Sequence, residues 1–189
     1  MSGNWLSLKQ LRKLGVTVLG TNIHVSKDCR LYNPANIILH DNIRIDDFTL
    51  LAARGPIEIF NYVHIASHCL LSSGTCIKVH NFANIASGSK LIGSTDDFGG
   101  DYLMGPTIPK QYLNVRSGDI ILNEHVILGS STIVLPSVTF GEGTAVGASS
   151  LIWGNTDPWT IYIGTPAKKL RDRNKSCIEM AKQLQPYLK

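Results

Sequence analysis

The chain has 189 residues, of which 43% are hydrophobic and 17% are charged, and its formal net charge at pH 7 is +4. This composition excludes a disordered chain and suits one globular domain with its own core. The basic residues are scattered apart from one group at 168–175, so the charge pattern does not indicate a nucleic-acid-binding surface.

No stretch approaches the roughly 18 apolar residues of a membrane-spanning helix, so we expect no membrane span. The first residues lack the apolar core of a signal peptide, which predicts a cytoplasmic protein. The four cysteines match no metal or redox motif, and we expect packed free thiols rather than disulfides.

Residues 7–14 predict a short amphipathic helix. Ser7 can cap its start, Leu8, Leu11 and Leu14 share one face, and Gly15 ends it. We expect the segment 1–15 to close the open end of the fold that follows, because exposed strand edges invite aggregation.

Residues 16–93 repeat every twenty residues. Three columns of large aliphatic residues carry the repeat: Leu19, Leu39, Ile59 and Val79; Val25, Ile45, Ile65 and Ile85; Leu31, Leu51, Leu71 and Leu91. Each unit divides into three hexads and two additional residues, and the additional residues always fall at the same corner. A period of six is neither the 3.6 of a helix nor the 2 of a flat strand, and it is typical of a parallel β-helix.

The repeat stops after Leu91. Residues 94–118 are rich in Gly, Pro, Asp and Tyr, and they leave from the corner that holds the additional residues. A long loop without regular structure is uncommon in a compact domain and is usually functional, so we expect a functional excursion loop here.

Residues 119–153 resume the hexads with a coil length of 18. Aliphatic or aromatic residues recur every six positions: Leu122, Leu128, Val134, Phe140, Val146 and Ile152. The sequence therefore predicts an all-β solenoid of about six coils, and it disfavours a β-sandwich because alternation by two fails. The tail 154–189 predicts a strand at 161–163, a turn at 164–166 and a helix at 174–188. We expect the whole chain, 1–189, to form one domain.

The hexads, followed by the segment Tyr-Ile-Gly-Thr-Pro-Ala-Lys-Lys-Leu at 162–170, resemble the hexapeptide-repeat acyltransferases. Within that family the chain is similar to sugar acetyltransferases related to galactoside and maltose acetyltransferase, and to those of surface-polysaccharide synthesis. The resemblance implies a left-handed parallel β-helix, acetyl-CoA as the acyl donor, no metal, and a homotrimer with its active sites between subunits.

The resemblance also implies a donor site. Gly129, Gly147 and Ala148 leave the backbone open to the pantetheine arm of CoA. Thr165 and Pro166 match the tail that wraps the nucleotide end. Lys168, which also matches that tail, and Arg171 are the expected partners of its phosphates.

Acyl transfer to a hydroxyl needs a general base, which in the galactoside and maltose enzymes is a histidine at the start of the excursion loop. This sequence has Ser-Thr-Asp-Asp-Phe at 94–98 and no histidine in 94–118. Asp97 is the candidate base, and His68, at an outward position three after Ile65, is the alternative. The candidates for acceptor binding are Asp96, Asn84 and Tyr102.

The sequence leaves three functions open, and we favour the first. The first is an acetyl-CoA-dependent acetyltransferase that acts on a sugar hydroxyl in polysaccharide or lipopolysaccharide synthesis. The second is an N-acetyltransferase of a nucleotide-linked amino sugar, which the missing loop histidine favours because an amine needs less help from a base. A non-catalytic β-helix scaffold is the third, and the tail argues against it.

Overall fold

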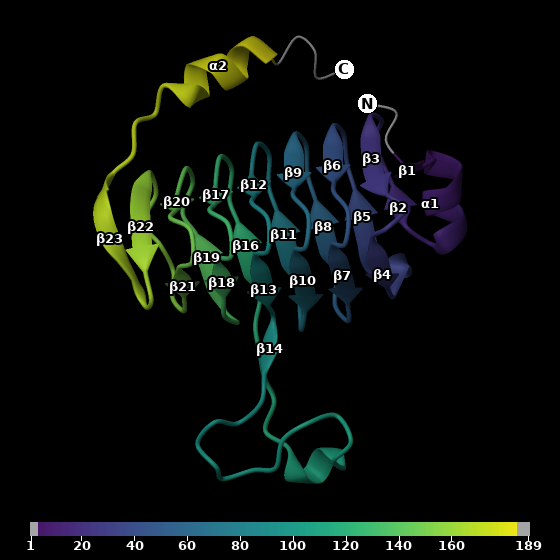
Figure 1. Cartoon of the computed structure of the whole chain (residues 1–189), viewed down its shortest axis with the longest axis vertical. Helices are drawn as coiled ribbons and strands as arrows, with labels where there is room; N and C mark the ends of the chain where they lie inside the picture. Colours follow the sequence, from purple (N-terminus) through teal and green to yellow (C-terminus); the bar gives the residue numbers. More distant parts are fainter. Residues whose placement is uncertain (1–3, 185–189) are drawn as a thin grey trace.

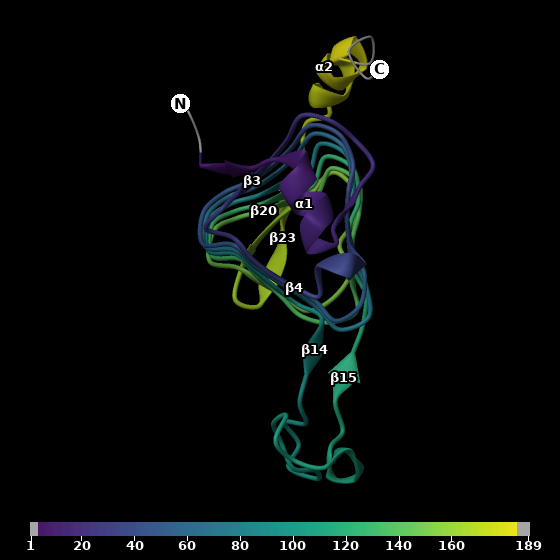
Figure 2. The same ribbon diagram turned by 90° about the vertical axis from the view of Figure 1, so that its right-hand side faces the viewer.

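The computed structural model describes residues 4–184 of the chain. It is a left-handed parallel β-helix with the shape of a triangular prism (Figures 1 and 2), and each coil contributes one strand to each of three sheets. The described residues form six complete coils, and β22 begins a seventh, so the predicted fold and the approximate coil number are confirmed.

The three faces are named here sheets A, B and C. Sheet A contains β1 (Trp5–Leu6), β3 (Ile23–Ser26), β6 (Ile43–Ile45), β9 (Val63–Ile65), β12 (Asn84–Ile85), β17 (Ile127–Leu128), β20 (Ala145–Val146), β22 (Thr160–Gly164) and β23 (Ala167–Asp172). Sheet B contains β2 (Thr17–Val18), β5 (Ile37–Leu39), β8 (Ile57–Ile59), β11 (Ile77–Val79), β16 (Ile120–Leu122) and β19 (Val138–Phe140). Sheet C contains β4 (Arg30–Tyr32), β7 (Leu50–Ala53), β10 (Leu70–Ser73), β13 (Lys90–Ile92), β18 (Ile133–Val134) and β21 (Leu151–Ile152).

The predicted aliphatic columns form the core of the prism. In sheet A, for example, Val25, Ile45 and Ile65 lie side by side in register and are almost completely buried. A single coil cannot bury its own apolar face, so the stacking of coils creates this core.

One member of the predicted columns is wrong. Val18, not Leu19, pairs with Leu39, and Leu19 is 63% exposed. Seven positions separate Val18 from Val25, whereas six separate Leu39 from Ile45, so the first turn holds one additional residue. A shift by one residue moves a side chain to the opposite face of a strand, which is why Leu19 faces solvent.

The small hydroxyl residues of the later hexads donate hydrogen bonds to backbone carbonyl groups at the corners. Thr132 Oγ1 donates to the carbonyl of Gly129 at 2.7 Å, and Ser150 Oγ donates to the carbonyl of Gly147 at 2.7 Å. Both side chains are buried, and these bonds satisfy hydroxyl groups that would otherwise destabilise the core.

Helix α1 (Leu8–Leu14) closes the N-terminal end of the prism. Ser7 and Gln10 form a reciprocal capping box, and Gly15 ends the helix in the left-handed region at φ 102°. Leu11 is fully buried, but Leu14 is 50% exposed, so the predicted apolar face is narrower than expected. Strand β1 pairs antiparallel with β3 and covers the edge of sheet A.

The three edges of the prism are named by the sheets that meet there. Two additional residues per coil lie at the B/C edge, where β7 leads to β8 and β10 leads to β11, as predicted.

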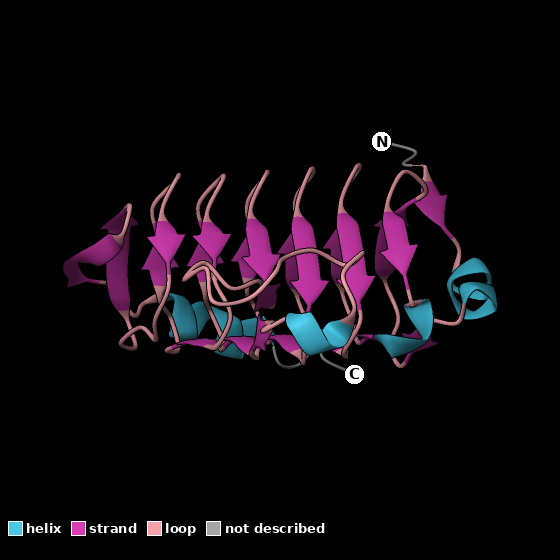
Figure 3. Cartoon of the chain, turned by 90° about the horizontal axis from the view of Figure 1, so that it is seen from below, coloured by secondary structure: helices cyan, strands magenta, loops and turns pink. Residues whose placement is uncertain are grey.

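The excursion loop leaves from the same edge through the antiparallel pair β14 (Ser94–Thr95) and β15 (Arg116–Ser117). It contains the 3-10 turn η2 (Lys110–Tyr112), and seen from below it lies lengthwise under the prism (Figure 3). A second 3-10 turn, η1 (Pro34–Asn36), fills the B/C edge of the first coil.

The C-terminal segment forms the hairpin β22–β23, of which the sequence predicted the first strand and missed the second. Helix α2 (Cys177–Leu184) then folds back along the A/B edge (Figures 1 and 2). The predicted helix extended to 188, and its last four residues lie outside the described residues. Among residues 4–184 no helix has the length and apolar character to cross a bilayer.

Candidate functional site

A row of backbone N–H groups is unpaired along the A/C edge, one from each of four successive coils. The amide of Gly147 donates to Tyr162 and that of Ser149 donates to Ser130, both at 2.8 Å, but within residues 4–184 the amide of Ala148 between them has no acceptor. The same holds for three equivalent residues in earlier coils: Ser67, Ser87 and Ser130. Coils stack about 4.8 Å apart, so this edge offers regularly spaced donors to an extended ligand.

The predicted glycines of the donor site stand next to these amides. The N–H of Gly129 donates to Val146 at 2.8 Å, and its carbonyl accepts from Ser89 and Thr132, so both of its backbone groups are used inside the prism. A Cβ at Gly129 would lie 2.6 Å from the amide nitrogen of Ala148. The structure therefore gives Gly129 a role in close coil stacking, and of the predicted residues it favours Ala148 as a hydrogen-bond donor.

The tail residues lie at the C-terminal end of the same edge. Thr165 and Pro166 form the turn between β22 and β23, and Thr165 Oγ1 donates to the carbonyl of Ser149 at 3.0 Å. Lys168 and Arg171 follow on β23, both exposed, and neither lies within 4.0 Å of a carboxylate of the described residues. Two cations thus remain available close to the row of amides.

Asp97 organises the start of the excursion loop. Its Oδ2 accepts backbone hydrogen bonds from Gly100 at 2.9 Å, Asp101 at 3.0 Å and Tyr102 at 3.3 Å. Desolvation raises the pKa of the Asp97 carboxyl, but these amide N–H groups together outweigh it, so the pKa is lowered. The side chain is therefore ionised at neutral pH and is a weaker base than an ordinary carboxylate.

The structure does not bring all predicted acceptor residues together within one chain. Asp97 and Tyr102 share the loop, and Asp96 lines the cavity beneath it. His68 lies at the A/C edge, stacked on Phe48 with ring centroids 5.0 Å apart. Asn84 lies on the outer face of sheet A, in a groove beside α2. Sheet C separates His68 from the loop of the same chain.

A charged cluster on sheet A was not predicted as a site. Arg44 Nε lies 2.7 Å from Asp46 Oδ1, and His64 Nε2 lies 2.8 Å from Asp46 Oδ2. Burial raises the pKa of Asp46, but the hydrogen bonds and charges of His64 and Arg44 lower it below its ordinary value. The twenty-residue spacing of Arg44 and His64 was the sequence signal that these side chains are neighbours.

The prism and the loop that interrupts it are those expected of an acyltransferase of the hexapeptide-repeat class, with the amide-lined edge as its candidate donor site. No family model matches the sequence. A curated relative, dTDP-4-amino-4,6-dideoxy-D-glucose acyltransferase of Escherichia coli, is 34% identical over 178 residues, which cover 94% of this chain and 93% of that protein. The chain therefore belongs to the hexapeptide-repeat acyltransferases, and the predicted family and enzyme class are confirmed.

Solved structures extend this comparison. The crystal structure of AntD, an N-acyltransferase from Bacillus cereus in complex with dTDP and 3-hydroxybutyryl-CoA, is 40% identical, with a TM-score of 0.94 and coverage of 98% of both chains. Galactoside acetyltransferase in complex with coenzyme A is 17% identical with a TM-score of 0.59, covering 88% of this chain and 69% of that one, and it shares the fold. A putative lipopolysaccharide biosynthesis O-acetyl transferase of Escherichia coli is 27% identical over 158 residues, covering 77% of this chain and 76% of that protein.

Proposed function

We propose that the protein transfers an acyl group from acyl-CoA to the amino group of a nucleotide-linked amino sugar. The similarity to AntD carries this proposal, since structures of that enzyme contain coenzyme A together with dTDP or dTDP-4-amino-4,6-dideoxyglucose. The proposed acceptor is therefore the amino sugar, which was the alternative to a hydroxyl acceptor in the sequence analysis. A polysaccharide hydroxyl, its first choice, has weaker support, because the O-acetyl transferase relative is less similar and covers less of the chain.

The A/C edge suits the acyl donor. Pantetheine is a long chain with two amide groups, and the amides of Ala148 and Ser130, which have no acceptor within residues 4–184, lie along the edge where such a chain would run. Gly129 keeps adjacent coils close there, and the cations of Lys168 and Arg171 stand near the end of the edge for the phosphates of CoA. Thr165 and Pro166 form the turn that this nucleotide end would meet.

The reaction forms a C–N bond and breaks the C–S bond of the thioester, and the amine loses a proton while the thiol gains one. A neutral amine is already a nucleophile, so the base requirement is smaller than for a hydroxyl. The Asp97 carboxylate, with its lowered pKa, is suited to hold the amino group by a charge-assisted hydrogen bond rather than to remove a tightly held proton. Asp97 and the alternative base His68 remain predictions, as do the acceptor contacts Asp96, Asn84 and Tyr102.

A homotrimer would bring these parts together. The outer face of sheet C is mostly apolar, with Leu50, Leu70, Ile133 and Leu151 in one ladder that Arg30 begins and Lys90 interrupts. If three copies turn this face toward a common axis, the A/C edge of one copy meets the B/C edge of the next. The excursion loop of one subunit would then cover the donor edge of its neighbour. We propose this assembly for a cytoplasmic enzyme whose single domain spans the chain.

The direct test is product mass after incubation with acetyl-CoA or 3-hydroxybutyryl-CoA and a pair of matched nucleotide sugars. One sugar carries an amino group at C4 and the other a hydroxyl group at C4. We expect an acyl adduct on the amino sugar and release of free CoA thiol. Acylation of the hydroxy sugar alone, or of neither sugar, would reject the proposal.

A further inference from the structure

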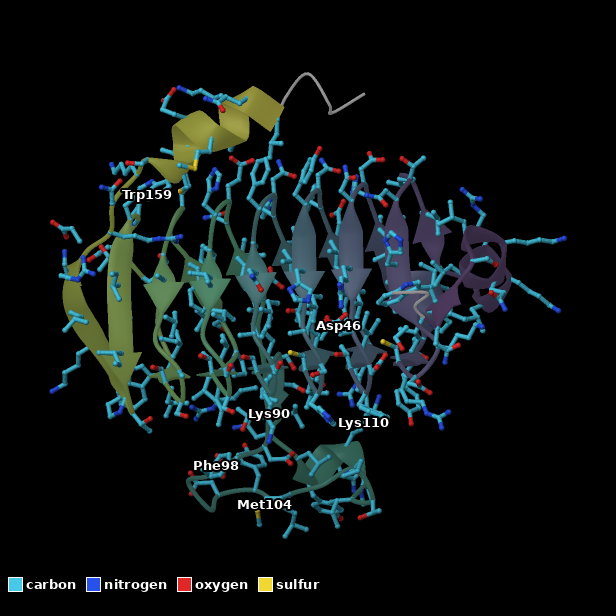
Figure 4. The ribbon with its side chains drawn as sticks, turned by 45° about the horizontal axis from the view of Figure 1, so that its top comes forward. Asp46, Lys90, Phe98, Met104, Lys110 and Trp159 are labelled. Carbon is cyan, nitrogen blue, oxygen red and sulfur yellow. The ribbon has the colours of Figure 1, made fainter. Side chains whose placement is uncertain are left out.

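The excursion loop and the B/C edge enclose a cavity of about 680 Å³. Its walls come from the loop and from the corner of the second coil, and they include Arg54, Ser94, Asp96, Ile108, Lys110, Leu113 and Ser117. Figure 4 shows Lys110 on the side of the loop that faces the prism, whereas Met104 points away from it. The cavity is large enough for a nucleotide-sized ligand.

Two cations line this cavity without a counter-ion. Neither Arg54 nor Lys110 lies within 4.0 Å of a carboxylate oxygen of residues 4–184. The backbone of Arg54 is fixed by the corner, because its N–H donates to Ala52 and its carbonyl accepts from Asn36 at 3.3 Å. Its guanidinium has no hydrogen-bond partner in the described part of the chain, so the corner holds the residue in place and leaves the charge for a ligand.

The other walls of the cavity are of two kinds. Ser94 and Ser117, which pair across the stem of the loop, and Asp96 are polar wall residues. Ile108, Leu113 and three further wall residues are apolar or lack a side chain. A ligand that fits this arrangement is anionic in one part, has an apolar ring, and carries a cationic or hydroxyl group for the carboxylate.

We propose that this cavity binds the nucleoside diphosphate of the acceptor, with Arg54 and Lys110 as the ligands of the diphosphate. This assignment rests on the proposed function and adds to it the residues that recognise the acceptor. Arg54 offers a planar fork of donors to phosphate oxygens, and Lys110 offers a mobile point charge. Asp96 lies in the same cavity for the amino sugar, and Asp97 follows it directly in the chain.

The test compares Arg54→Gln and Lys110→Gln with the matched variant Arg116→Gln. Arg116 is an exposed arginine on the stem of the same loop, and it does not line the cavity. The probes are dTDP, UDP and thymidine without phosphate, measured by calorimetry, and CoA as a donor control. Each cavity variant should weaken dTDP binding about tenfold, because a charge-assisted hydrogen bond is lost. Thymidine binding and CoA binding should change by less than twofold.

Steady-state kinetics gives a second readout. In the cavity variants the KM for the nucleotide amino sugar should rise about tenfold, while kcat and the KM for acyl-CoA stay within twofold. Unchanged dTDP binding in both variants, or an equal loss in Arg116→Gln, would overturn the inference even if the enzyme acylates the amino sugar. Failure of the wild-type protein to bind any nucleoside diphosphate would overturn it too. Tight dTDP binding without acyl transfer would reject the proposed function and leave the diphosphate assignment standing.

Discussion

The Nε2 atom of His64 lies 2.8 Å from Oδ2 of Asp46, and the other oxygen of that carboxylate accepts from Arg44. Asp46 therefore joins two neighbouring coils across the outer face of sheet A (Figure 4). The pKa of its carboxyl is lowered in the folded protein, so the carboxylate stabilises the fold above the unfolded pKa of about 3.9. That contribution is lost as the pH falls through the lower, folded pKa.

Asp46→Asn should therefore lower the free energy of unfolding at pH 7 by roughly 0.5–1 kcal/mol, the range of partly exposed ion pairs. Thermal denaturation followed by circular dichroism between pH 7 and pH 3 measures the effect. The difference from wild type should shrink once the pH falls below about 4. Asp28→Asn, at an exposed carboxylate in a turn of the first coil, is the control. A deficit of the same size at pH 7 and pH 3 would contradict this account.

Two substitutions distinguish a structural role of Asp97 from a chemical one. Asp97→Asn keeps an oxygen that can accept the loop amides, whereas Asp97→Ala removes it. If the charge matters for the reaction, both variants should lower kcat at least tenfold. Only the alanine variant should increase hydrogen exchange in residues 94–118. Because the pKa of Asp97 is lowered, the wild-type rate should show no acid limb from this group between pH 5 and pH 7. If Asp97→Asn keeps the wild-type kcat, Asp97 orders the loop and takes no part in the reaction.

Gly129→Ala tests the stacking of coils at the donor edge. The new Cβ would lie 2.6 Å from the amide nitrogen of Ala148 and 2.8 Å from the carbonyl oxygen of Val146, so the coils must separate. We expect a loss of about 1–3 kcal/mol in unfolding free energy, typical of overpacking, and at least tenfold weaker CoA binding. Gly154→Ala is the control, because its Cβ would meet nothing within 4 Å. Normal CoA affinity in Gly129→Ala would argue against this edge as the donor site.

Leu70→Glu tests the apolar face of sheet C. Leu70 lies between Leu50 and Lys90 in the outward ladder, and a carboxylate there would replace apolar contacts and would be desolvated in a subunit interface, even with Lys90 beside it. We expect sedimentation equilibrium to show a trimer for wild type and a monomer for the variant. Lys78→Glu places a carboxylate on the outer face of sheet B and should leave the trimer intact. A wild-type monomer, or a trimeric Leu70→Glu protein, would refute the assembly.

Periodicity made most of this fold predictable. Each aliphatic column, the corner of additional residues and the loop at 94–118 follow from spacing, because the stacked coils repeat one geometry. The slip at Leu19 shows the limit, since a terminal coil has a neighbour on one side only and its register is less constrained. Strand β23 was missed because its charged, mostly exposed sequence lacks an apolar period.

The site was less predictable than the fold. The amide of Ala148 is left without an acceptor in residues 4–184 by the backbone geometry, and no residue type in the sequence predicts this. The glycine at 129 drew attention to the right edge, although its own peptide groups are occupied. Arg54 lies at the corner where the twenty-residue repeat has its two additional residues, but only the folded loop brings it near Lys110, which is 56 positions further along the chain.

The corner that admits two additional residues in the early coils also admits the whole excursion loop. At this position the length of the chain can change without disturbing the hydrogen-bonded ladders on either side. If the loop binds the acceptor as proposed, relatives with the same prism can diverge in the molecule they acylate by replacing this loop, which is about one eighth of the chain. Grafting a foreign 94–118 segment onto this scaffold is a natural route to altered acceptor choice with an unaltered thioester site.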